Sequence, residues 1–163
     1  MSEQHAYKNS PLQVGDFAPD FTLDKDGGGN ITLSRLRGKN VVIYFYPKDD
    51  TPGCTTESKD FRDYISDFEY HDTVVLGISK DSIESHNKFK GKYNLSFPLL
   101  SDEEGSVCAA YNAWVEKNMY GKKYMGIERS TFLIDKKGVI KAVWPKVKVD
   151  GHVKEVIKAV ENL

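Results

Sequence analysis

Short continuous apolar runs alternate with helix-spaced apolar positions along the chain, which predicts buried strands followed by amphipathic helices. Residues 41–46 form an unbroken β-branched and aromatic run that predicts a strand buried on both faces, and Pro47 ends it. From Thr55 onward, apolar residues recur at i, i+3, i+4 and i+7, which predicts a helix with one face on the sheet. These residues are Phe61, Tyr64, Ile65 and Phe68.

A second strand and helix follow the first pair. Residues 73–79 form a further apolar run, and a helix through about Tyr93 is predicted to begin after Asp81 or Ser82 as its N-cap. Two such units in succession predict parallel strands that are joined by right-handed crossovers.

The second half of the chain changes to paired strands. A strand at residues 97–100 and a short helix that opens at residues 101–104 precede a predicted hairpin of residues 130–135 and 139–144. Near the N-terminus, three consecutive glycines predict a hairpin turn before an edge strand at residues 31–33. A C-terminal helix is predicted to bury Val153, Val156, Ile157 and Val160. This order predicts an α/β thioredoxin-like fold: a central mixed sheet flanked by helices, with an N-terminal extension and a mid-chain insertion.

Length and composition limit the class of protein. With 163 residues, of which 39% are hydrophobic and 29% charged, the chain is predicted to form one domain over residues 1–163. A net charge of -1 without a lysine and arginine block argues against nucleic acid or an anionic membrane as a partner. No stretch approaches the length of a membrane span, and two widely separated cysteines do not form a disulfide framework, so a cytoplasmic location is expected.

Cys54 lies where the first predicted strand and its loop give way to a helix. The partial positive charge and free N–H groups of a helix start favour thiolate over thiol, which predicts a nucleophile. Thr51 in the same loop offers a hydroxyl that both donates and accepts, and Arg129 at the start of the hairpin offers a permanent cation. Taken singly, Cys54 fits a small buried residue, Thr51 a turn and Arg129 a surface ion pair, but their combination favours a site.

The loop sequence Pro47-x-x-x-Thr51-x-x-Cys54 resembles the active-site motif of the peroxiredoxins, and residues 45–55 are similar specifically to the bacterioferritin-comigratory, or Q-type, branch. Further segments that look like family landmarks, in the expected order, are residues 15–21, 33–39, 97–102 and 129–135. The resemblance covers nearly the whole chain and implies a thiol-dependent peroxidase for hydrogen peroxide and organic hydroperoxides. It also implies that Cys54 is the peroxidatic cysteine, that Thr51 and Arg129 bind and polarise the peroxide, and that Pro47 shields the loop.

The implied reaction is an attack of the Cys54 thiolate on one peroxide oxygen. Sulfenic acid forms on the sulfur, and hydroxide or alkoxide leaves toward donors that include Arg129. No metal or organic cofactor is expected. The histidines are scattered along the sequence, and surface positions without a metal-binding role are predicted for all four. They are His5, His71, His86 and His152.

The position of a second, resolving cysteine is where this chain departs from the Q-type pattern. Many members carry it five residues after the first, where this chain has Lys59, and another subset carries it near Phe89 or Lys90 in the next helix. Only Cys108 remains, in a context that favours a buried structural thiol, although a resolving role stays open. We therefore expect a one-cysteine enzyme, a monomer or homodimer, that is regenerated by thioredoxin, glutaredoxin or a small thiol.

Three other functions fit parts of this sequence. A thiol-disulfide oxidoreductase on the same fold needs a Cys-x-x-Cys pair, and Glu57 occupies the position of its second cysteine. A redox sensor or chaperone-like binder would use the same sulfenic acid on Cys54 as a switch, and only catalytic turnover separates it from an enzyme. A purely structural binding module would leave the combination of Thr51, Cys54 and Arg129 unexplained.

Overall fold

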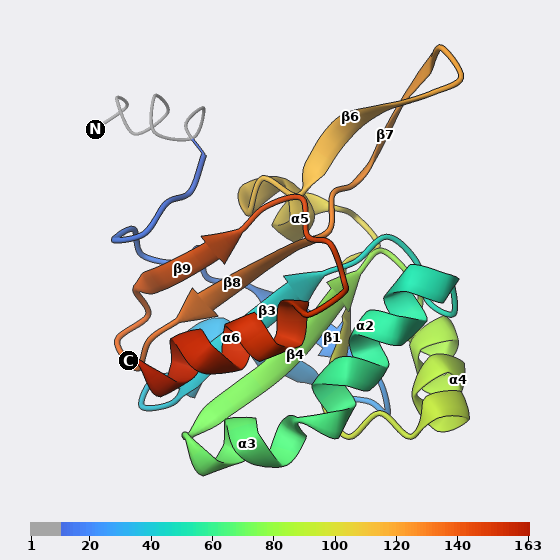
Figure 1. Ribbon diagram of the computed structural model, residues 1–163. Coiled ribbons are helices and arrows are strands. Elements are labelled where there is room, and N and C mark those ends of the chain that lie inside the picture. Colours follow the sequence, from blue (N-terminus) through green and yellow to red (C-terminus); the bar gives the residue numbers. More distant parts are fainter. Residues whose placement is uncertain (1–10) are drawn as a thin grey trace.

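A mixed sheet with helices on both faces, and a separate two-stranded hairpin, make up the computed structural model, which describes residues 11–163 (Figure 1). The strands are β1 (Thr22–Lys25), β2 (Asn30–Thr32), β3 (Asn40–Phe45), β4 (Thr73–Ser79), β5 (Leu99–Ser101), β6 (Trp114–Met119), β7 (Lys122–Ile127), β8 (Ser130–Ile134) and β9 (Ile140–Trp144). The helices are η1 (Leu33–Leu36), α2 (Pro52–Asp63), α3 (Ile65–Tyr70), α4 (Ile83–Tyr93), α5 (Ser106–Ala110) and α6 (His152–Glu161). None of these helices is long and apolar enough to cross a membrane.

The seven-stranded sheet has the order β2-β1-β5-β4-β3-β8-β9, with β3 near its centre. Every residue of β3 is buried, as expected for a β-branched and aromatic strand that is covered on both faces. β3 pairs in parallel with β4, which confirms the predicted crossover, and antiparallel with β8. The triple glycine lies in the turn of the antiparallel β1–β2 hairpin, and the predicted C-terminal hairpin forms β8 and β9.

β3 separates two apolar cores, because successive side chains of a strand point to opposite faces. Val42 and Tyr44 pack with residues of α2, α3, α4 and α6, in what we call the helix-side core. Val41, Ile43 and Phe45 pack with residues of α5 and of the segment before β1, in what we call the opposite core. Figure 1 shows α2, α3, α4 and α6 together in front of the sheet. Residues that belong to different cores are therefore separated by the sheet.

The single helix predicted beyond Thr55 is in fact two helices. α2 starts before that residue and ends at Tyr64, whose φ of −107° and ψ of 13° leave the helical conformation, and α3 follows directly. Phe61 of α2 and Phe68 of α3 are both buried in the helix-side core. The apolar spacing therefore continues across the break, which is why the sequence pattern does not reveal it.

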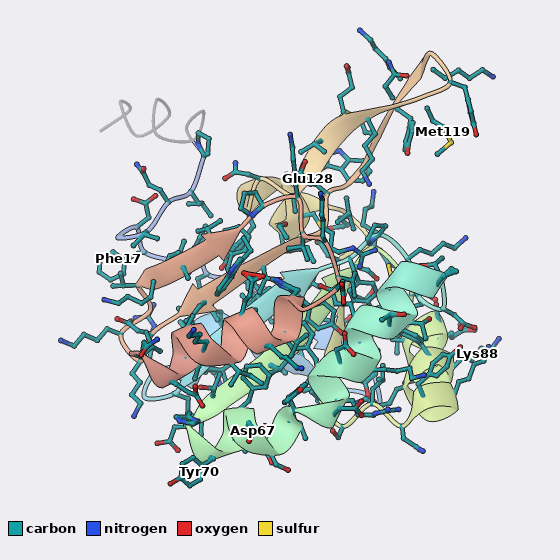
Figure 2. All side chains as sticks on the ribbon, in the orientation of Figure 1. Phe17, Asp67, Tyr70, Lys88, Met119 and Glu128 are labelled. Atoms are coloured by element: carbon teal, nitrogen blue, oxygen red, sulfur yellow. The ribbon has the colours of Figure 1, made fainter. Side chains whose placement is uncertain are left out.

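β6 and β7 form a hairpin that projects from the sheet and was not among the predicted elements (Figure 1). Its register runs from the pair Trp114 and Ile127 at the base to the pair Met119 and Lys122 near the tip. Figure 2 shows Met119 at the outer end of the hairpin. Most of its side chains are exposed on both faces, so its strands lack the apolar alternation that identifies a half-buried strand.

Two histidines are buried, so the prediction of surface positions is wrong for them. His86 is fully buried between a carboxylate and a backbone carbonyl, and His152 is buried beside a threonine hydroxyl. These partners satisfy the polar ring atoms inside the fold, and they come from segments that are distant in sequence. His71 is partly exposed, and His5 lies outside the described residues.

Candidate active site

Cys54 is the third residue of α2, at the point where the loop after β3 enters the helix. Thr51 is the N-cap, in extended conformation, and its carbonyl accepts a hydrogen bond from the Thr55 N–H at 2.8 Å. Pro52 occupies the first helical position, where its fixed φ suits the helix and its missing N–H has no cost. The thiol thus lies at a helix start as predicted, but it is only 1% exposed and packs in the helix-side core.

Arg129 lies beside Cys54 because of the register between β3 and β8. Ser130 at the start of β8 pairs with Phe45 at the end of β3. Arg129, just before β8, therefore lies at the same end of these two strands as the loop that leads to Cys54. The Nη2 atom of Arg129 lies 3.4 Å from the Sγ atom of Cys54. The structure therefore brings together the cation and the thiol that the sequence analysis paired.

Glu57 holds the other side of the Arg129 guanidinium. Its Oε1 accepts a hydrogen bond from Nη1 at 2.6 Å, and its Oε2 is buried without a hydrogen-bond partner among residues 11–163. Burial raises the pKa of Glu57 to about 7, although the charge of Arg129 opposes this rise. Burial also works against the Arg129 cation, but the charges of Glu57 and Cys54 raise the Arg129 pKa.

Glu57 was not among the residues predicted for the site from the sequence. The available signal was its spacing, because a residue three positions after Cys54 in a helix lies on nearly the same face. A carboxylate on that face lies close to a cation that approaches the thiol, and here the two form an ion pair with Glu57 fully buried.

Thr51 and Pro47 lie in the predicted loop, and the Thr51 hydroxyl contacts the backbone of that loop. The Thr51 hydroxyl donates to the Lys48 carbonyl at 2.8 Å, so its proton is directed into the loop and not toward Cys54. Its oxygen keeps the capacity to accept a further hydrogen bond. Pro47 is exposed at the beginning of the loop, where its ring removes one backbone donor.

Cys108 lies away from this site, in the opposite core. Its side chain is fully buried in α5, and the Asp102 carboxylate accepts a hydrogen bond from its backbone N–H at 2.8 Å. Burial and the nearby Asp102 charge raise the pKa of Cys108 far above its usual value. In this conformation the sheet therefore separates Cys108 from Cys54.

A cluster of polar side chains lies between the loop that precedes Cys54 and helix α4. Asp49, Asp81 and His86 bring one ligand-type atom each within 4.8 Å of one another, a grouping that the sequence analysis did not foresee. Hydrogen-bond donors from the protein already surround the Asp49 oxygens, namely the hydroxyls of Tyr46 and Ser85. We therefore describe these five residues as a hydrogen-bonded group, the Asp49 cluster, and not as a metal centre.

The geometry around Cys54 fits attack by sulfur on a small electrophile. A helix start and a neighbouring guanidinium both stabilise a thiolate. The same Arg129 donors are placed to stabilise negative charge that moves from the sulfur to a leaving group. The site thus combines a nucleophile with an anion-stabilising group, and a buried carboxylate fixes the orientation of the latter.

Several known proteins are similar to this chain in both sequence and fold. The model of the AhpC/TSA family matches residues 14–143. The chain is 60% identical to a bcp peroxiredoxin relative from Coxiella burnetii over 146 residues, which are 90% of this chain and 97% of that protein. Peroxiredoxin Q of Xanthomonas campestris matches with a TM-score of 0.84 and 46% identity, over 87% of this chain and 90% of that one. The Xanthomonas campestris bacterioferritin comigratory protein, described for its alkyl peroxide reduction activity, matches with a TM-score of 0.84, 45% identity and the same coverage.

Proposed function

Because the chain belongs to the AhpC/TSA family, as a thiol-dependent peroxidase of the Bcp, or peroxiredoxin Q, branch, we propose that Cys54 is the residue that attacks the peroxide. The observation that carries this proposal is the 3.4 Å separation between the Cys54 sulfur and Arg129 Nη2 at the start of α2. Cys108, which is fully buried in the opposite core, offers no comparable surroundings for a thiolate.

The Cys54 thiolate supplies the electron pair for the reaction. A sulfur–oxygen bond forms with the hydroxyl oxygen of the peroxide while the oxygen–oxygen bond breaks, so the sulfur is oxidised to sulfenic acid. The second oxygen leaves as hydroxide or alkoxide, which takes up a proton to become water or an alcohol. Arg129 stabilises the negative charge as it moves from sulfur to oxygen, and Glu57 keeps the guanidinium in place.

The loop residues Thr51 and Pro47 act on the position of the peroxide. The Thr51 oxygen is available to accept a hydrogen bond from the peroxide hydroxyl, since its own proton is given to the Lys48 carbonyl. Pro47 keeps a backbone donor out of the entrance to the loop and limits its conformations. Both roles rest on the place of these residues in the loop that precedes Cys54.

Hydrogen peroxide and organic hydroperoxides are the substrate class that this site suits. The attacking sulfur needs only the oxygen–oxygen bond, so the remainder of the molecule affects binding and not the bonds that are made and broken. The Xanthomonas campestris relative that is described for alkyl peroxide reduction supports the inclusion of alkyl hydroperoxides.

An external thiol regenerates Cys54 from the sulfenic acid. The position five residues after Cys54 is Lys59, and Cys108 lies on the other face of the sheet, so neither supplies a resolving thiol within this conformation. Thioredoxin, glutaredoxin or a small thiol then completes the cycle as the electron donor. Such donors are available in the cytoplasm, where thiols are kept reduced, and this is the location we assign.

The test is peroxide consumption with excess dithiothreitol by wild type, Cys54→Ser and Cys108→Ser. We expect many equivalents of peroxide to be reduced per wild-type or Cys108→Ser molecule, and none above background by Cys54→Ser. Arg129→Lys should fold and react about a hundredfold more slowly, because a lysine cannot contact both Glu57 and the sulfur as the guanidinium does. Full turnover by Cys54→Ser would overturn the proposal, and a single equivalent per wild-type molecule would favour a redox sensor.

A further inference from the structure

Asp49 connects the Cys54 loop to helix α4 through a set of short hydrogen bonds. Its carboxylate accepts from the Tyr46 hydroxyl at 2.6 Å, from the Ser85 hydroxyl at 2.8 Å and from His86 Nδ1 at 2.7 Å. Its backbone N–H donates to the Asp81 carboxylate at 2.8 Å. Asp49 and His86 are both buried, so these bonds are made without competing water.

The partners of the His86 ring determine where its protons lie. Nε2 is 2.9 Å from the Leu100 carbonyl of β5, which can only accept, so Nε2 carries a hydrogen. Nδ1 lies 2.7 Å from the Asp49 carboxylate, which also accepts from two hydroxyls. The two partners of the ring thus favour a hydrogen on each nitrogen, which is the imidazolium form.

The charged groups around His86 are consistent with this assignment. Burial works against the imidazolium, but the hydrogen bond and charge of Asp49, the Leu100 carbonyl and the charge of Asp81 together raise the His86 pKa above its usual value. The other titratable group that faces the ring is Tyr46, at 6.4 Å between ring centres, and burial raises its pKa, which keeps the phenol neutral.

The loop has a second attachment to the other end of α4. Asp50 adopts a φ of 58°, a conformation that is unfavourable for a residue with a side chain. Its carboxylate accepts from Lys92 at 2.9 Å and from the Tyr93 hydroxyl at 2.8 Å, and both lie in the last turn of α4. Two consecutive carboxylates thus connect the loop to the first and last turns of one helix.

We propose that His86 is a positioning residue for the peroxidase reaction: its doubly protonated ring holds Asp49 and thereby keeps the loop from Pro47 to Thr51 docked on α4, with Cys54 in its reactive place. Asp49 lies two residues before the N-cap Thr51 and five before Cys54, so little chain separates the ion pair from the nucleophile. The proposal rests on the assignment of Cys54 as the peroxidatic residue. It predicts loss of reactivity, as opposed to loss of folding, when the ring loses its charge.

The consequence for pH follows from the charge on His86. The ion pair is present below the raised pKa of His86 and is lost as the pH rises through it, so the loop loosens as the pH passes that pKa. The Cys54 oxidation rate of wild type should fall over that range. A variant without the imidazole should not show this decrease.

The first experiment is a double-mutant cycle with His86→Leu, Asp49→Asn and the combined variant, measured as the rate of Cys54 sulfenic acid formation by hydrogen peroxide. Lys88→Leu, an exposed substitution on the same helix, is the matched control (Figure 2). We expect each single variant to react about tenfold more slowly, the combined variant to be no slower than either, and the control to match wild type. Wild-type rates in a folded His86→Leu variant, or losses that multiply in the combined variant, would contradict the proposal.

The second experiment needs no variant and is decisive even if His86→Leu fails to fold. Nitrogen-15 chemical shifts of the His86 ring in wild-type protein at about pH 6 should show both nitrogens protonated, and a neutral ring would overturn the inference. A failure of the proposed function can be told apart from a failure of this inference. Peroxide turnover by Cys54→Ser would contradict the role of Cys54, and it would leave the measured protonation of His86 unchanged.

Discussion

Cys54 and Cys108 lie on opposite faces of the seven-stranded sheet, the first in the helix-side core and the second in the opposite core. A disulfide requires Cα atoms within about 7 Å, and two side chains that pack against opposite faces of one sheet do not meet this condition. The two thiols could bond to each other only after the sheet or one of its flanking helices had moved. The two cysteines of the chain are therefore not placed to form a disulfide with each other in this conformation.

Peroxide-treated wild type should contain sulfenic acid, or its adduct with an added thiol, on Cys54 and an unmodified Cys108. The physical reason is the environment of Cys108, where burial and the negative charge of Asp102 raise the pKa of the thiol and keep it protonated. Mass spectrometry of proteolytic peptides, with and without a sulfenic acid trap, measures this. Cys108→Ala should keep the wild-type peroxidase rate, and a peptide that links the two cysteines would contradict the prediction.

Gly53→Ala should slow the oxidation of Cys54 while the helix itself becomes slightly more stable. A Cβ at this position would lie 3.1 Å from Arg129 Nη2, the same atom that contacts the sulfur, so the guanidinium has to move by a few tenths of an ångström. We expect about a fivefold slower reaction with peroxide, together with a gain of up to about 1 kcal/mol in the free energy of unfolding.

Gly91→Ala is the control for this effect, because Gly91 lies in α4 with open space around it. It should gain similar stability and retain the wild-type rate. Stopped-flow kinetics and urea unfolding together separate the two outcomes. A Gly53→Ala variant that reacts as fast as Gly91→Ala would show that the guanidinium position is not limiting.

Glu57→Gln should change the pH dependence of stability. Glu57 has a pKa of about 7 in the folded protein and an ordinary pKa of 4.5 in the unfolded chain. At a pH between these two values, the folded protein keeps a proton on Glu57 that the unfolded chain has lost. The stability due to this group therefore decreases as the pH rises from about 4.5 to about 7, by about 3 kcal/mol, and the glutamine variant lacks this decrease.

His152 contributes in the opposite direction over an overlapping range. Burial and the charge of Arg129 lower the pKa of His152 from 6.5 to about 4, so its stability contribution is lost as the pH falls from 6.5 toward 4. In Glu57→Gln, stability should thus rise more steeply with pH between 4.5 and 6.5 than in wild type. Urea unfolding across this range measures it, with Glu69→Gln at an exposed position as control, and parallel curves for all three proteins would refute the prediction.

Gly77→Ala should destabilise the protein by about 1–3 kcal/mol. A Cβ in this central strand would lie 2.9 Å from the Tyr44 ring and 3.0 Å from a Leu99 methyl group. The Tyr44 ring cannot easily retreat, because it is fully buried and its hydroxyl bonds to Ser58 at 2.8 Å. Thermal unfolding compared with Gly91→Ala provides the measurement, and a melting temperature equal to that of wild type would disprove the steric argument.

The sequence predicted those helices and strands in which burial of one or both faces requires apolar residues at regular positions. In residues 73–79, Val74, Val75, Leu76 and Ile78 are apolar because β4 is covered by neighbouring layers, and the predicted bounds match the strand. The break at Tyr64 escaped prediction because the helices on either side bury the same face. The β6–β7 hairpin escaped for the converse reason: a strand exposed on both faces has no apolar period to detect.

Site residues were predicted from the sequence where they lie close to Cys54 in the chain or at the end of a predicted strand. Thr51 and Cys54 share one loop and helix start, and Arg129 was found through its place at the end of a predicted strand. The partners of Glu57 and His86 come from distant segments, so neither pairing can be seen in the neighbouring sequence. For Glu57, the spacing of three residues from Cys54 was the one local signal. Their environment arises only when β3, β8, α2 and α4 are packed together.

The projecting β6–β7 hairpin has consequences for how the molecule behaves at high concentration. It forms its own two-stranded sheet, so its outer edges present backbone donors and acceptors to solvent, next to the exposed Met119, Tyr120 and Tyr124. Such an edge is a template for pairing with another chain. Lys122 and Lys123 place positive charge beside the turn, and repulsion between two such tips opposes that pairing. Because salt screens this repulsion, the charges protect the edge of the hairpin less as ionic strength increases.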